Sequence, residues 1–107
     1  MVTNFETVKT AAIKYADDVR RVMTVDKAVL FGSYAKGTAN EQSDIDVCFF
    51  LSGFDAKHRG DIICDLLRIS DTSYKGIYFE PTIFPTSELE NDNPFVKEII
   101  RTGMEIE

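Results

Sequence analysis

Hydrophobic and polar positions alternate along this chain with periods that change from segment to segment, and each period predicts an element. Near the N-terminus, apolar residues recur every three or four positions, which is the spacing of one face of an amphipathic helix. The stripe consists of Phe5, Val8, Ala12, Tyr15, Val19 and Val22. Thr3 and Glu6 form a capping box that predicts where this helix begins. The same spacing predicts a second helix over Ala56–Ile69, whose inward residues are Ile62, Ile63, Leu66 and Leu67.

Shorter apolar runs predict three strands, which are Lys27–Phe31, Asp44–Leu51 and Lys75–Phe84. Pro81 interrupts the third run, and because proline cannot donate to a ladder, this strand is expected at a sheet edge or bulge. A last helix is expected after Asn93 as cap, with Pro94 at its first position and Gly103 just past its end. The alternation of strands and helices predicts an α/β (α+β) fold, in which helices pack on a small mixed sheet.

Composition places the chain among ordinary globular proteins, with 107 residues, 44% hydrophobic and 28% charged. We expect one domain over residues 1–107, because this length supports a single core. No apolar run approaches a membrane span and no signal peptide pattern opens the chain, so we expect a cytoplasmic protein without a membrane partner. Cys48 and Cys64 both lie in apolar stretches, which favours buried free thiols over a disulfide.

The formal net charge of −6 argues against a long nucleic acid as partner, since such a ligand requires a basic face. The surface suits a small molecule or a basic partner protein instead.

Asp44 and Asp46 are the first candidates for chemistry. Residues i and i+2 of a strand point to the same face, roughly 6–7 Å apart. Two carboxylates on one face repel each other unless a cation lies between them, so the pair predicts a metal site. Turn or capping aspartates are the alternative. An EF-hand does not fit, because the third oxygen ligand and the central glycine are missing.

The turn that precedes the aspartates, Gly32 to Gly37, has the composition of a phosphate-binding loop. Gly32 lets a triphosphate approach the backbone, Ser33 adds a hydroxyl donor, and Lys36 on the following short helix adds a mobile positive charge. A plain strand-to-helix turn is the alternative. A Walker A loop is excluded, because Thr38-Ala39 stand where that motif requires Lys and then Ser or Thr.

Together, Gly-Ser-x-x-x-Gly from Gly32 and Ser-Asp-x-Asp from Ser43 resemble the motif of the nucleotidyltransferase superfamily. The chain is most similar to minimal nucleotidyltransferase (MNT) proteins, which are often encoded beside a helical HEPN partner. The resemblance covers nearly the whole chain and implies a third carboxylate on a later strand. Glu80 is the candidate, although the family usually has Asp there. Asp71 is the poorer candidate, because we expect it in a solvated turn over Ser70–Ser73, and a strand-edge charge is the alternative for Glu80.

The resemblance further implies a magnesium-dependent enzyme with a two-metal site and ATP as the nucleoside triphosphate substrate. Asp44, Asp46 and Glu80 would be the catalytic metal ligands, and Gly32, Ser33 and Lys36 would bind the nucleotide. The acceptor would be a hydroxyl of a partner protein, as in antitoxins that adenylylate a HEPN-type toxin. The absence of a second domain to hold an acceptor also favours a separate partner chain.

Two other functions stay open. One is transfer to a small molecule such as an aminoglycoside, for which a homo-oligomer could build the acceptor pocket. The other is a binding module that neutralises its partner by contact alone. His58 is interpreted as a solvated helix residue, Tyr34 and Tyr78 as core or rim residues, and the acidic stretch Glu88 to Asp92 as a polar loop.

Overall fold

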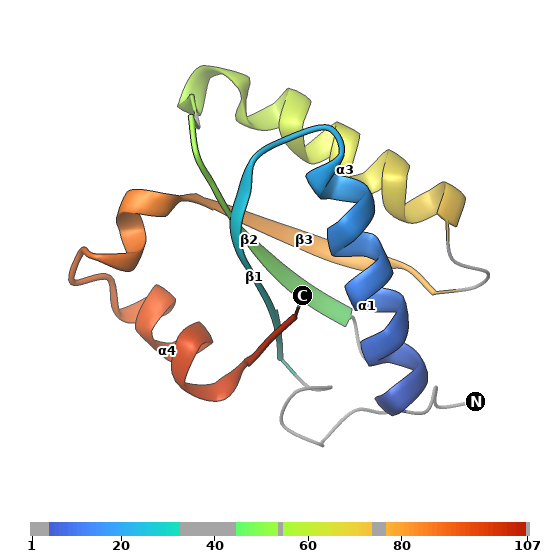
Figure 1. Ribbon diagram of the computed structural model, residues 1–107. Coiled ribbons are helices and arrows are strands. Elements are labelled where there is room, and N and C mark those ends of the chain that lie inside the picture. Colours follow the sequence, from blue (N-terminus) through green and yellow to red (C-terminus); the bar gives the residue numbers. More distant parts are fainter. Residues whose placement is uncertain (1–4, 33–44, 54, 74–76, 107) are drawn as a thin grey trace.

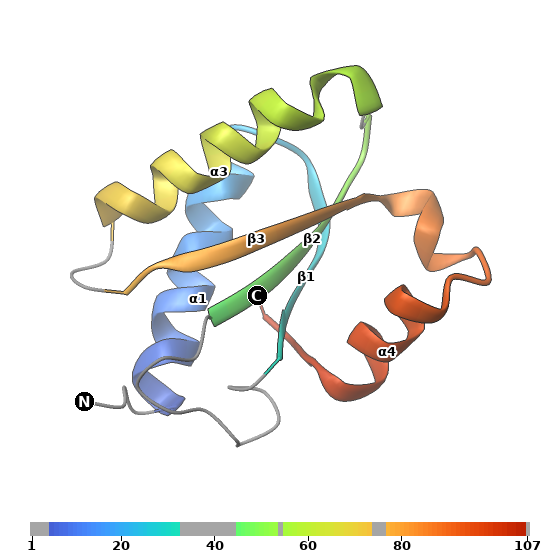
Figure 2. The same cartoon turned by 180° about the vertical axis from the view of Figure 1, so that it is seen from behind.

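The computed structural model describes residues 5–32, 45–53, 55–73 and 77–106. In these residues a mixed sheet with strand order β3-β2-β1-β4 separates helices α1 and α3 on one face from α4 on the other (Figures 1 and 2). The α/β expectation is therefore confirmed. The elements are α1 (Phe5–Arg20), β1 (Val25–Phe31), β2 (Ile45–Leu51), α3 (Arg59–Ser73), β3 (Phe79–Pro85), α4 (Pro94–Thr102) and β4 (Met104–Glu105), with 3-10 turns at Ala56–His58 (η1) and Thr86–Leu89 (η2).

The central strand β1 is antiparallel to both of its neighbours, β2 and β4, whereas β2 and β3 are parallel. Strand β3 lies at the edge, as Pro81 predicted. It begins at Phe79, later than expected, and α3 continues past Ile69 to Ser73. The expected turn over Ser70–Ser73 is therefore wrong, and Asp71 belongs to the last turn of α3. The helix continues because Ser70 is buried in it, where its Oγ accepts the N–H of Phe79 at 2.9 Å.

Alternate residues of the strands pack into two separate cores. Val47 and Phe49 of β2 face α1 and α3, whereas Cys48 and Phe50 face α4. Tyr15 organises the first core: its ring stacks on Phe79 with the centroids 4.8 Å apart, and its hydroxyl donates to the carbonyl of Leu66 at 2.8 Å. The predicted helical stripe is confirmed at Val8, Ala12, Tyr15 and Val19, which are fully buried.

Three apolar positions expected inside lie at the surface. Val22 is 65% exposed because α1 ends at Arg20, so the helical period no longer applies to it. Leu67 is 45% exposed and Cys64 is also exposed. The buried face of α3 carries Leu66 and Ser70, and Leu67 and Cys64 lie outside that face. Both cysteines are free thiols as expected, and burial raises the pKa of Cys48 to about 12.

The outer edge of β3 is covered by hydrogen bonds from the rest of the chain. Arg59 donates from Nη1 to the carbonyl of Ile83 at 3.1 Å, and Ser70 accepts the N–H of Phe79. Pro81, between them, has no N–H to offer. These three features disfavour the addition of another strand at this edge. Among the helices of the described residues, none is both long enough and apolar enough to cross a bilayer.

Gly103, which caps α4 as predicted, is where we expect a single methyl group to destabilise the fold. A Cβ built there would lie 2.5 Å from Val29 Cγ1 and 2.6 Å from the carbonyl oxygen of Ile99. Gly103→Ala is therefore expected to lower the free energy of unfolding by about 1–3 kcal/mol, as overpacking does. Gly60→Ala is the control, because a Cβ there meets nothing within 4 Å. Urea titrations of both variants measure the difference, and equal midpoints would contradict the packing.

Candidate functional site

Two carboxylates lie side by side where β2 and β3 begin. Asp46 and Glu80 are direct partners in the parallel register of these strands. Adjacent strands lie about 4.8 Å apart, and register partners in a parallel pair point to the same face. That face carries α4, because Cys48, Phe50 and Phe84 occupy the same alternation and pack against this helix. The structure therefore brings Asp46, which is half-buried, next to Glu80, which is exposed.

The end of β1 meets this pair at Gly32. Phe31 is the register partner of Asp46 across the antiparallel pair, so Gly32 follows directly beside the carboxylate. Its φ of +80° is in the left-handed region that favours glycine. A Cβ built on Gly32 would overlap Oδ2 of Asp46 and lie 3.3 Å from its Cγ. The absence of a side chain is thus what allows the backbone to approach Asp46. The predicted approach of a triphosphate to Gly32 stays a prediction.

The other predicted site residues, Ser33, Lys36 and Asp44, lie outside the described residues, so their roles stay predictions. Within the described ranges no group of three His, Cys, Asp or Glu side chains converges to hold a metal ion. The observed pair supplies hard carboxylate oxygens, which are the donors that magnesium and calcium prefer. Asp44, two residues before Asp46, is the position from which a further carboxylate would join them. The donor set therefore fits a hard divalent cation.

A polar cluster around the single carboxylate of Asp26, which sequence reasoning missed, lies at the opposite end of the sheet. Asp26 near the start of β1 accepts hydrogen bonds from the hydroxyls of Ser52 and Thr86, the latter at 2.6 Å. These hydrogen bonds lower the pKa of Asp26. Asp26 lies near the start of β1, Ser52 follows β2 and Thr86 begins η2. The hydrogen bonds therefore connect three elements at this end of the sheet. No local pattern signals it, since each residue alone resembles an ordinary loop residue.

His58 has the surface position that the sequence predicted. Its side chain is 64% exposed, with Nε2 3.7 Å from Asp55 and Nδ1 3.8 Å from Asp61. It lies in η1, which follows the end of β2 and directly precedes α3, whereas the carboxylate pair lies where β2 begins. The acidic stretch from Glu88 is partly ordered as η2, and Glu88 accepts a hydrogen bond from the Nδ2 of Asn93, the cap of α4. The cap of α4 is Asn93 itself, whose Oδ1 accepts the N–H groups of Phe95 and Val96, so Glu88 holds the capping side chain without capping a helix.

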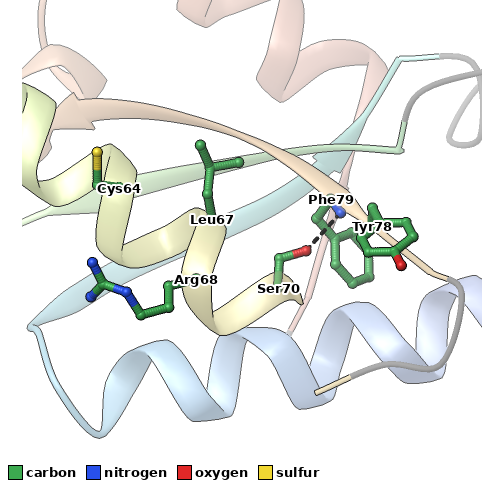
Figure 3. Close-up of a pocket in the computed structure, with 6 residues that line it drawn as sticks. All are labelled: Cys64, Leu67, Arg68, Ser70, Tyr78 and Phe79. Atoms are coloured by element: carbon green, nitrogen blue, oxygen red, sulfur yellow. Dashed lines mark hydrogen bonds between the residues drawn. The ribbon is translucent and has the colours of Figure 1, made fainter. Parts of the chain in front are cut away.

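A surface hollow of about 430 Å³ lies between α3 and the start of β3 (Figure 3). It is lined by Cys64, Leu67, Arg68, Ser70, Tyr78 and Phe79. Arg68 pairs with Asp65 at 2.9 Å, and no lining residue is a carboxylate. Tyr78, 61% exposed, is a rim residue as expected. The hollow therefore lacks the carboxylate donors for a metal-bound nucleotide, which the Asp46 and Glu80 pair offers.

Comparisons with known proteins identify the family and the fold of this chain. Residues 13–101 match the family model described as nucleotidyltransferase domain. Among solved structures, the chain is similar to a crystal structure from Sulfolobus solfataricus whose protein is assigned as a nucleotidyltransferase. The two share 15% sequence identity with a TM-score of 0.62, over 98% of this chain and 87% of the other. At this identity the likeness shows the fold. Among curated proteins, none matches this sequence significantly.

Proposed function

This chain belongs to the nucleotidyltransferase domain family, and from that premise we propose that it transfers a nucleoside monophosphate from ATP to a hydroxyl of a partner protein. The observation that carries the proposal is the registered pair of Asp46 and Glu80, with the backbone of Gly32 against Asp46. The pair provides adjacent carboxylates, and the glycine allows the end of β1 to lie directly against one of them. Ordinary structural carboxylates do not require such a close backbone approach.

Magnesium is the cofactor that these residues fit. Asp44, Asp46 and Glu80 would hold it, since all three offer hard oxygen ligands. When bound, the ion would neutralise negative charge on the triphosphate and on the departing pyrophosphate. Gly32 and Ser33 would present the backbone N–H and the hydroxyl to the phosphates, and Lys36 would add a positive charge. Both cysteines are free thiols, which suits the reducing cytoplasm that we propose as its location.

The reaction follows from these positions. The acceptor hydroxyl oxygen attacks the α-phosphorus in line and forms a new P–O bond, while the bond from the α-phosphorus to the bridging oxygen breaks and pyrophosphate leaves. Glu80 is the exposed member of the pair, so an incoming hydroxyl reaches it first. Its carboxylate takes the proton that the hydroxyl loses. Half-buried Asp46 is held in place by its neighbours and serves as the fixed ligand.

For the acceptor, we propose a HEPN-type helical protein, so that the chain acts as an antitoxin by adenylylating its toxin. The similarity to MNT proteins supports this choice, and the net charge of −6 suits a basic partner surface. The test is incubation of the chain with ATP labelled at the α-phosphate, alone, with a co-purifying or neighbouring-gene HEPN protein, and with kanamycin. Mass spectrometry then locates any added nucleotide.

Label on the HEPN protein that disappears when Asp46 is changed is the expected result. Labelled kanamycin with unlabelled protein would replace this proposal with the small-molecule alternative. Neutralisation of the partner without any label transfer would favour a binding module instead.

Gly32→Ala provides a separate test of the close approach to Asp46. The new Cβ would displace the Asp46 carboxylate, so we expect nucleotide transfer to fall by about 10–100-fold, as for a catalytic group misplaced by an ångström. Gly53→Ala is the matched control. Gly53 has a similar φ of +70° but open space around its Cβ, so both variants share the left-handed strain of roughly 1–2 kcal/mol. The free energy of unfolding should fall by a comparable amount in Gly32→Ala and Gly53→Ala. Comparable rates of nucleotide transfer in the two variants would rule out the role given to Gly32.

A further inference from the structure

The start of β3 is held by a buried hydroxyl group. Tyrosine and cysteine aside, Ser70, 2% exposed, is the one buried polar residue among those that the structure describes. Its Oγ accepts the N–H of Phe79, nine residues further along the chain, at 2.9 Å (Figure 3). A hydroxyl group in an apolar interior is unfavourable unless it is hydrogen-bonded. This contact is therefore a specific anchor for the backbone of Phe79.

Two further contacts fix Phe79 and the helical turn that carries Ser70. The ring of Phe79 stacks on Tyr15, with the centroids 4.8 Å apart and the planes inclined by 8°. The hydroxyl of Tyr15 donates to the carbonyl of Leu66 at 2.8 Å, and Leu66 lies about one helical turn before Ser70 on α3. We call Tyr15, Leu66, Ser70 and Phe79 the Phe79 bracket. It holds the side chain of Phe79 from α1 and its backbone N–H from α3.

Glu80 directly follows the Phe79 bracket. In the parallel register Phe79 pairs with Ile45, and Glu80 pairs with Asp46. Glu80 is exposed, so packing around its own side chain does not fix its position. Pro81, on its other side, has no N–H through which the backbone could be anchored. The placement of the Glu80 carboxylate beside Asp46 therefore depends on the ladder with β2 and on the anchored backbone of Phe79.

We propose that Ser70 is a positioning residue for nucleotide transfer, and that its hydrogen bond to Phe79 keeps Glu80 beside Asp46. This inference rests on the proposed function, in which Glu80 takes the proton of the acceptor hydroxyl. Without the Oγ of Ser70, the buried N–H of Phe79 loses this acceptor, and a shift of the β3 start toward water becomes favourable. Misplacement of a catalytic group by about an ångström can lower the rate by about 100-fold.

Ser70→Ala is the test variant, and Thr86→Val is the matched control. Thr86 donates its hydroxyl to Asp26 at 2.6 Å just past the other end of β3, about 20 Å from Glu80 along the strand. With labelled ATP and the acceptor protein, kcat should fall about 10–100-fold in Ser70→Ala, while KM for ATP stays within about twofold of the wild type. Thr86→Val should keep the wild-type kcat. Unchanged kcat in Ser70→Ala, or an equal loss in both variants, would overturn the proposal.

A double-mutant cycle with Glu80→Gln shows whether Ser70 acts through Glu80. If it does, Ser70→Ala should change the rate of transfer by less than about threefold once residue 80 can no longer accept the proton. A merely structural loss would instead lower the rate by the same factor in both backgrounds. Losses that multiply in this way would overturn the positioning role of Ser70.

Two NMR measurements without nucleotide separate this inference from the proposed function. In the unmodified protein, the Phe79 amide should exchange its hydrogen more than about 100-fold more slowly than an unstructured amide. Rapid exchange would overturn the anchor, even if Ser70→Ala fails to fold.

The second measurement compares nuclear Overhauser contacts between the backbones of Asp46 and Glu80. These contacts should weaken in Ser70→Ala and persist in Thr86→Val, and unchanged contacts in Ser70→Ala would overturn the proposal. Weakened contacts in a protein whose transfer does not need Glu80 would defeat the proposed function and leave the positioning of Glu80 by Ser70 standing. Normal contacts in Ser70→Ala, with transfer that does need Glu80, would leave the function standing and defeat the role of Ser70.

Discussion

Replacement of Asp44 and Asp46 together by asparagine is expected to weaken magnesium-dependent binding of a non-hydrolysable ATP analogue by more than about 100-fold. Substitution of a residue that only hydrogen-bonds a metal ligand already lowers metal affinity by about 10–100-fold. In this double variant two proposed direct ligands lose their charge, so the loss should be larger. Asparagine keeps the shape of each side chain, so the effect isolates the charge. Isothermal calorimetry with and without magnesium measures the loss.

Asp61→Asn is the control for this experiment. It removes the same charge from a side chain that is 88% exposed in the first turn of α3, on the face of the sheet opposite to the candidate site. Its affinity should match that of the wild type. If the double variant binds the nucleotide as tightly as Asp61→Asn does, the metal assignment is wrong, and the pair near Asp46 has a structural role.

Local periodicity predicted the face that Asp46 occupies, but it could not predict that Asp46 pairs with Glu80. The alternation of side chains along a strand correctly placed Asp46 and Val47 on opposite faces of β2. Pro81 correctly placed β3 at the edge of the sheet. That Asp46 lies opposite Glu80 depends on the parallel register of β2 and β3. The register joins two strands that α3 separates along the chain, so neither strand's own pattern contains it. The proximity of the two carboxylates is therefore information that the structure adds.

Errors in the sequence interpretation share a physical origin, which is competition between local pattern and tertiary packing. Leu67 fits an apolar helical period, yet it is 45% exposed, because α3 turns the adjacent Leu66 into the first core. Asp71 looked like a turn residue because Ser, Asp and Thr cluster there, but the hydrogen bond from the N–H of Phe79 to Ser70 favours continuation of the helix. The Asp26 cluster joins residues 26 and 60 positions apart in sequence, so no window along the chain could reveal it.

The third carboxylate is where we expect the largest loss of activity from one substitution. Glu80→Gln should reduce nucleotide transfer by roughly 10²–10⁴-fold, the range typical for loss of a general base. Because Glu80 is exposed, the variant should remain folded, with its stability within about 0.5 kcal/mol of the wild type. Nucleotide binding should persist, since Asp44 and Asp46 remain. The measurement is single-turnover transfer from labelled ATP, alongside calorimetry of the bound nucleotide analogue.

Asp71→Asn is the comparison that distinguishes the two candidates for this role. Asp71 belongs to the last turn of α3, a helix that packs on the opposite face of the sheet from Glu80, so its charge should contribute little to transfer. A large loss in Asp71→Asn together with near-normal transfer in Glu80→Gln would mean that the proton is removed from the α3 side, and that the pair formed by Asp46 and Glu80 is not the reactive centre.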